Sequence, residues 1–68
     1  MKRYVIRVEF KGHNQIGYFR SEESITAFKE KALVCSKSYA EGLCRGINFG
    51  INFYGDEECK QAYVEELK

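Results

Sequence analysis

The sequence predicts a single small α+β domain in the order ββαβα, with a three-stranded, mainly antiparallel sheet and two helices packed on one face. Apolar and polar residues alternate over residues 3–11 and again over 47–54, a pattern typical of half-buried strands. Apolar residues recur at helical spacing over 22–35 and from residue 56 onwards. With 68 residues, no proline and no low-complexity segment, residues 1–68 are expected to form one domain.

The first two strands are predicted to form a hairpin. One face of the strand over residues 3–11 is apolar and consists of Tyr4, Ile6, Val8 and Phe10. Gly12-His13-Asn14 supplies residues that tolerate positive φ, and a short extended run over 15–20 follows it directly. The two extended runs are therefore expected to pair.

Residues 22–35 are predicted to form the first helix. A hydroxyl and two carboxylates, in Ser21-Glu22-Glu23-Ser24, suit the amino end of a helix. The apolar positions that follow at helical spacing are Ile25, Phe28, Ala32 and Cys35. Residues 36–46 are compatible with a helical turn and with a loop, because Gly42 and Gly46 interrupt a weak helical spacing.

The strongest strand pattern is in residues 47–54. Ile47, Phe49, Ile51 and Phe53 alternate with Asn48, Gly50, Asn52 and Tyr54. Gly55-Asp56 then predicts a break and a helix cap, and the second helix is expected to run to the C-terminus. Its apolar positions are Cys59, Ala62, Tyr63 and Leu67.

Charge and cysteine content indicate an ordinary protein of the cytoplasm. The formal net charge is +1, so the strong positive field of most nucleic-acid-binding domains is absent from the domain as a whole. Charges interrupt the apolar run near the N-terminus, and no run approaches the roughly 20 residues that span a bilayer. Three cysteines without paired spacing fit a reducing compartment, so we expect a cytoplasmic location and no membrane partner.

No pattern in the chain indicates catalysis, a metal or a cofactor. Three cysteines and His13 could supply zinc ligands, but the close Cys-x-x-Cys pair typical of zinc sites is missing. Cys35 and Cys59 are better interpreted as small apolar residues on buried helix faces. His13 lies in a predicted turn, and no cysteine spacing favours a Cys–His pair. We therefore expect no catalytic residue, no metal and no cofactor.

The polar face of the predicted sheet is the expected binding surface. If the first and third strands are neighbours, that face carries Arg3, Arg7, Lys11, Asn48, Asn52 and Tyr54. An uncharged edge strand over 47–54 would also permit strand addition or a homodimer. A basic and aromatic sheet face is used by several RNA-binding modules, although the RNP1 pattern is missing here.

In size, single-unit organisation, near-neutral charge and lack of catalytic motifs, the chain resembles small phage-encoded accessory proteins, including inhibitors of the anti-CRISPR type. The resemblance is one of organisation, so no site residue is carried over. It implies a non-enzymatic interaction module that inhibits or regulates a protein partner by occupying its surface. The alternative is a nucleic-acid-binding protein that uses Arg3, Arg7, Lys11 and Tyr54.

Overall fold

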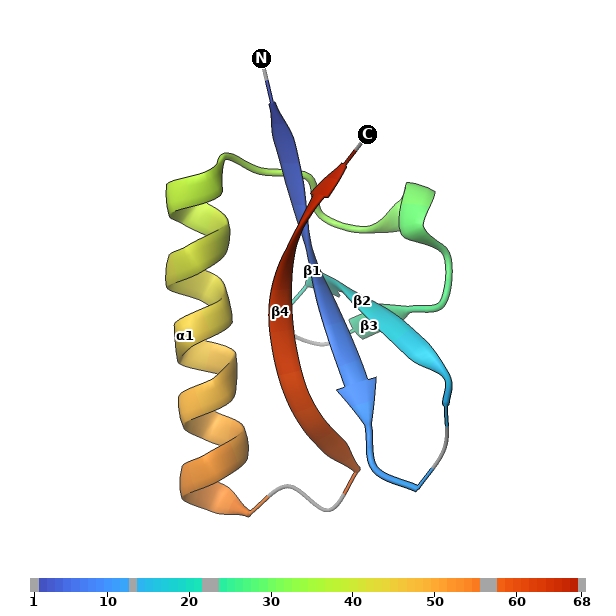
Figure 1. Ribbon diagram of the computed structural model, residues 1–68, viewed down its shortest axis with the longest axis vertical. Helices are drawn as coiled ribbons and strands as arrows, with labels where there is room; N and C mark the ends of the chain where they lie inside the picture. The colour runs from blue at the N-terminus through green and yellow to red at the C-terminus, as the bar shows by residue number, and fades with distance from the viewer. Residues whose placement is uncertain (1, 13, 22–23, 56–57, 68) are drawn as a thin grey trace.

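The computed structural model describes residues 2–12, 14–21, 24–55 and 58–67. These residues form β1 (Arg3–Phe10), β2 (Ile16–Ser21), β3 (Ser24–Thr26), the 3-10 turn η1 (Lys29–Lys31), α1 (Lys37–Tyr54) and β4 (Cys59–Leu67) (Figure 1). The strands form one antiparallel sheet in the order β3-β2-β1-β4. The predicted α+β class is confirmed. The predicted ββαβα order, with three strands and two helices, is wrong.

The first hairpin matches the prediction. β1 pairs with β2, where Arg7 faces Tyr18 and Glu9 faces Ile16. Gly12, in the turn between them, has a φ of 82°, which a residue with a side chain rarely adopts. The other predicted turn residue, His13, lies outside the described residues.

The helix predicted over 22–35 does not form, and its first two residues lie outside the described part of the chain. Ser24–Thr26 is β3 instead, and Ile25 lies opposite Phe19 of β2. Further on, the Leu33 amide donates to the Phe19 carbonyl, and Cys35 exchanges two backbone hydrogen bonds with Tyr4 of β1. Pairing with the sheet thus overrides the helical spacing of the apolar residues, two of which are β-branched or aromatic.

The strand predicted over 47–54 is also wrong, because these residues form the second half of α1. The hydroxyl of Ser36 caps the helix by accepting a 3.4 Å hydrogen bond from the Tyr39 amide. At the other end Gly55 adopts the left-handed conformation and donates to the Ile51 carbonyl. Ala40, Cys44 and Ile51 are all buried on one face of this helix. They are four and seven residues apart, which is the spacing of residues on one side of a helix.

The second predicted helix is a strand as well. Instead of a helix, Cys59–Leu67 forms β4, which pairs with the whole of β1 from Arg3↔Leu67 to Phe10↔Cys59. Its residues alternate between two faces of the sheet, so Ala62 is buried while Tyr63 is 38% exposed. Pairing with a long central strand therefore decides the conformation of this segment.

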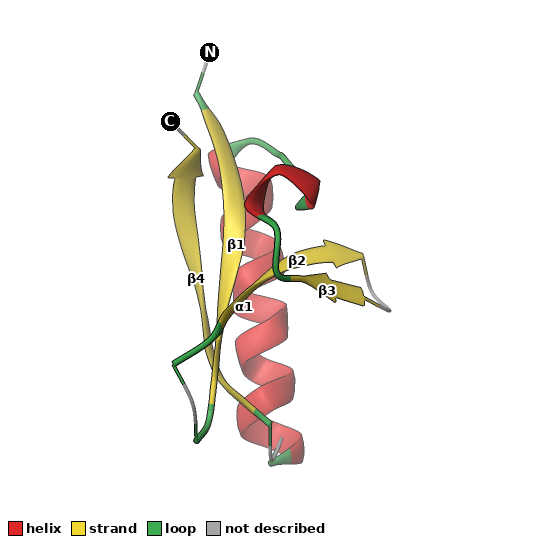
Figure 2. Ribbon diagram, turned by 90° about the vertical axis from the view of Figure 1, so that its right-hand side faces the viewer, coloured by secondary structure: helices red, strands yellow, loops and turns green. Residues whose placement is uncertain are grey.

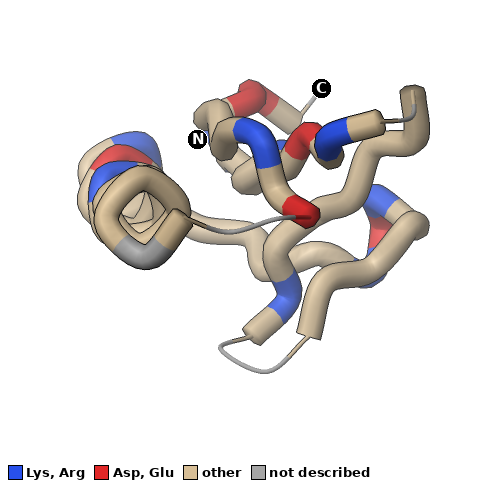
Figure 3. Tube along the Cα trace, turned by 90° about the horizontal axis from the view of Figure 1, so that it is seen from below, with Lys and Arg blue, Asp and Glu red and all other residues tan. Residues whose placement is uncertain are grey.

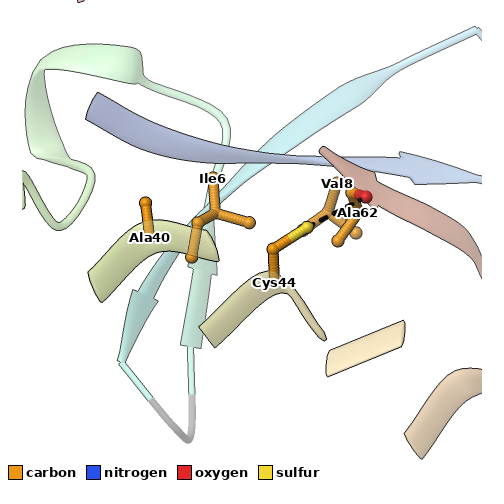
Figure 4. Packing of buried hydrophobic residues seen from close by; sticks show 5 residues of the cluster. All are labelled: Ile6, Val8, Ala40, Cys44 and Ala62. Carbon is orange, nitrogen blue, oxygen red and sulfur yellow. Dashed lines mark hydrogen bonds between the residues drawn. The ribbon is translucent and has the colours of Figure 1, made fainter. Parts of the chain in front are cut away.

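The main core lies between α1 and the β1–β4 half of the sheet. Its buried residues are Ile6, Val8, Ala40, Cys44 and Ala62 (Figure 4). All five side chains are small or β-branched, which lets the helix approach the sheet closely. The β2–β3 pair turns sharply away from β1 and β4, so α1 does not cover it (Figure 2).

Candidate functional site

The structure does not bring the six predicted site residues together. Arg3 and Arg7 lie on β1 and Lys11 follows it, whereas Asn48, Asn52 and Tyr54 lie on α1. The predicted sheet face formed by these six residues therefore does not exist. The side chain of Tyr54 lies outside what the structure describes, and Asn52 is exposed to solvent.

Asn48 binds the free edge of the sheet. Its Oδ1 accepts a 2.7 Å hydrogen bond from the Ala62 amide, and its Nδ2 donates a 3.0 Å bond to the Ala62 carbonyl. Ala62 faces Val8 on β1 and has its backbone groups on the outer edge of β4. Because the side-chain amide occupies both groups, Asn48 closes this point of the edge to a further strand. The prediction that Asn48 leaves an edge strand open to pairing is wrong.

Arg7 lies among acidic and aromatic groups on the sheet face that does not pack against α1. Its guanidinium lies 3.6 Å from Glu9, 3.7 Å from Glu65 and 5.0 Å from the centre of the Tyr63 ring. Lys29 forms a second ion pair with Glu65, and its hydrogen bond to that carboxylate raises the pKa of Lys29. Carboxylates therefore balance the positive charge that the sequence predicted for this face.

The cysteines are free thiols that serve the packing. Cys44 is buried and donates a 3.2 Å hydrogen bond to the Ala62 carbonyl, and burial raises the pKa of its thiol. Burial also raises the pKa of Cys35, which lies 3.7 Å from the Tyr4 carbonyl. Both thiols are thus kept protonated and weakly nucleophilic. Within the described ranges, no three histidine, cysteine or acidic residues group as metal ligands do.

A groove lies between α1 and the β2–β3 pair, and we call it the α1–hairpin groove. It has a volume of about 1020 Å³ and is open to solvent. Its apolar walls include Phe10, Ile16, Phe19, Ile25, Ile47 and Ile51. Glu58 is the only charged side chain among the described residues that line it. The groove is therefore suited to burying an apolar group, and among the described residues that line it only Glu58 and Cys59 are titratable.

The groove exists because α1 packs against the edge of the sheet rather than across its middle. Figure 3 shows α1 end-on, with the helix at one side of the molecule and the strands at the other. Most helix contacts are with β4, and fewer are with β1. Gly46 and Gly50 form the helix wall of the groove, and no atom lies within 4 Å of where a Cβ of either would be.

The opposite wall is held by a close contact between β2 and β3. A Cβ on Gly17 would lie 2.5 Å from Cγ2 of Ile25 and 3.0 Å from the Phe10 ring, so only glycine permits this packing. Ile16 and Ile25 remain 40% and 44% exposed on this wall. Apolar side chains held open to solvent in this way are typical of interaction surfaces.

Sequence reasoning missed this site because it assigned the helix wall and the β3 part of the opposite wall wrongly, although it predicted the strand that became β2. It placed Ile25 on a helix and Ile47 and Ile51 on a strand. Phe49 and Phe53, predicted to be core residues, are 65% and 69% exposed. The signal that could have located them is the stretch of 18 residues between the Ser36 cap and Gly55, which suits one long helix.

Comparison with protein-family models, with curated proteins and with solved structures found no match to the chain. In the part of the chain that the structure describes, no helix has the length and apolar character needed to cross a bilayer.

Proposed function

We propose that the protein is a small non-enzymatic interaction module that binds a protein partner through the α1–hairpin groove. The observation that carries this proposal is the groove itself, about 1020 Å³ in volume with mainly apolar walls. Burial of one of its half-exposed isoleucines would contribute on the order of 1 kcal/mol. Several such side chains on one surface are enough to support a specific interaction.

The partner would present mainly apolar side chains, because apolar residues form most of the described walls of the groove, with a few polar side chains such as Gln15, Ser24 and Thr26 beside them. Binding would then block or reshape the partner's surface without catalysing a reaction. This mode of action agrees with what the resemblance to small phage-encoded inhibitors implies. It replaces the predicted sheet face with a surface formed by α1, β2 and β3.

Nucleic-acid binding, the alternative function, is less well supported. Of its four predicted contact residues, Arg7 is engaged by Glu9 and Glu65 and is only partly exposed. Arg3 and Lys11 lie at opposite ends of β1. Oligonucleotide titration at two salt concentrations tests this alternative, because binding through phosphates would weaken steeply as salt rises.

Site-specific photocrosslinking in native host cells tests the proposed function. A benzophenone side chain at Ile16, on the groove wall, is expected to crosslink a protein, and mass spectrometry would identify it. The control site is Glu41, which is exposed on the charged side of α1. Crosslinked protein from Ile16 alone supports the proposal. Equal crosslinking from both sites, or none from either, contradicts it.

A further inference from the structure

Two stacked phenylalanine rings project from α1 into solvent. The ring centres of Phe49 and Phe53 are 5.4 Å apart, with 14° between the ring planes. They are the two most exposed large apolar side chains in the described residues, at 65% and 69%. A rigid aromatic pair of this kind is typical of the anchors found in protein interfaces.

The aromatic pair and the α1–hairpin groove belong to one surface. Phe49 and Phe53 each follow a glycine of the groove wall, Gly46 or Gly50, by three positions. Residues three apart are neighbours on a helix, so the rings stand next to the groove. A surface that carries both a projection and a depression can pair with itself, because a two-fold axis brings the same patch of both copies together.

The charges of the chain permit this pairing. The charged residues of α1 are Lys37, Glu41 and Arg45, which follow one line of the helix at four-residue spacing. From Gly46 to Tyr54 the helix carries no charge. Glu58 is the one charged side chain among the described residues of the groove, and the net charge is only +1, so two copies can approach through this surface without strong repulsion.

The exposed area of the whole chain is larger than that expected for a compact monomer of its mass. The molecule exposes 5110 Å², whereas a compact monomer of 7.9 kDa is expected to expose about 4400 Å². The excess of about 700 Å² is close to the roughly 800 Å² that each partner buries in a standard interface. The exposed area of the chain therefore leaves room for an interface of standard size.

The glycines of α1 have no packing role within one copy. A Cβ at Gly42, Gly46 or Gly50 would have no neighbour within 4 Å, yet each glycine weakens a helix relative to alanine. Close approach of a second molecule would supply the packing that the single chain lacks. This supports an occupant that meets the helix backbone directly.

We infer that the partner of the groove is a second copy of the chain, so this inference rests on the protein-binding role proposed above. In the dimer, Phe49 and Phe53 of each copy fill the α1–hairpin groove of the other around a two-fold axis. Each groove is incomplete until the other copy contributes its two rings.

Sedimentation equilibrium of the full chain, over a wide concentration range, tests the dimer. Joint Phe49→Ser and Phe53→Ser substitution is expected to raise the dissociation constant at least about 30-fold. Gly50→Glu, which places a charge in the groove, should have a similar effect while the far-UV spectrum stays helical. The control is Phe28→Ser, because Phe28 is 57% exposed but does not line the groove. It should leave the dissociation constant within about 3-fold of the original.

Mixing the two defective variants gives a sharper test. The Gly50→Glu chain keeps its rings and the double Phe→Ser chain keeps its groove, so together they retain one of the two contacts. The mixture should associate more tightly than either variant alone. A wild-type chain that stays monomeric, or a dimer that none of these substitutions weakens, overturns the inference. If the chain is monomeric but Ile16 still crosslinks a different protein, the proposed function stands without the dimer.

Discussion

Replacing Asn48 with alanine should destabilise the fold far more than the same change one turn later. The substitution removes both hydrogen bonds between the side-chain amide and Ala62, whose backbone is buried. A buried polar group left without a hydrogen bond lowers the free energy of unfolding by about 1–3 kcal/mol. The Ala62 carbonyl still accepts a weak hydrogen bond from the Cys44 thiol, so the Ala62 amide is the group that loses its partner. After a gain of about 0.5 kcal/mol in helix propensity, the expected loss is about 1.5–3 kcal/mol. That is a large part of the roughly 3–10 kcal/mol expected for 68 residues.

Urea denaturation followed by circular dichroism measures this loss, with Asn52→Ala as the matched control. Asn52 lies on the same helix but is exposed, so its substitution should stabilise by a few tenths of a kcal/mol. If the two variants differ by less than about 0.5 kcal/mol, the inference that Asn48 anchors α1 to the edge of β4 is refuted.

Asn48→Asp separates the two hydrogen bonds. The carboxylate still accepts from the Ala62 amide, but its second oxygen faces the Ala62 carbonyl in place of a donor. This contact favours the protonated acid and raises the folded-state pKa above the unfolded value of about 3.9. The native state then binds the proton more tightly, so the variant should gain stability as the pH falls through its folded pKa.

Three further predictions concern the groove wall, the core thiol and the polar face of the sheet. Gly17→Ala should lower the free energy of unfolding by about 1–3 kcal/mol because its Cβ would overlap β3, whereas Gly42→Ala should raise it by up to about 1 kcal/mol in urea titrations. Burial raises the pKa of Cys44, so Ellman's reagent at pH 8 should label this thiol much more slowly in the native protein than in urea. The hydrogen bond to Glu65 raises the pKa of Lys29. The contribution of this ion pair to the free energy of unfolding is therefore complete below the ordinary lysine pKa of about 10.4, and it is lost as the pH rises through the pKa of Lys29 in the folded protein. Glu65→Gln should reduce that alkaline loss, and an unchanged pH profile would count against the ion pair.

The amino-terminal hairpin could be predicted from the sequence because its information is local. Apolar and charged residues alternate in β1 from Ile6 to Phe10, and Gly12 meets a backbone requirement that few other residues satisfy. The same reasoning failed at residues 47–54, where Ile and Phe fit an alternating strand and a helix at once. Alternation there placed Phe49 and Phe53 in a core, whereas in the helix they face solvent. Capping by Ser36 and Gly55 and packing of the first half of the helix decide between the two.

Residues 59–67 show a different limit of local patterns. The face of β4 that does not meet α1 carries both the aromatic Tyr63 and the charged Glu65. The strand therefore lacks a regular alternation of apolar and polar residues. The carboxylate of Glu65 on this strand forms ion pairs with Arg7 and Lys29 from elsewhere in the chain. That compensation depends on tertiary pairing, which a window of local sequence does not contain.

The groove and the edge contact have a common physical origin. Ala40, Cys44 and Ala62 are small, so α1 approaches β4 closely and Asn48 reaches the Ala62 backbone. A helix held against one edge cannot also cover the β2–β3 pair, which twists away from it. The hydrogen bonds of Asn48 therefore fix the width of the groove as well as protecting the edge. If Asn48→Ala loosens the helix, binding at the groove should weaken together with stability, although no residue of the groove wall has changed.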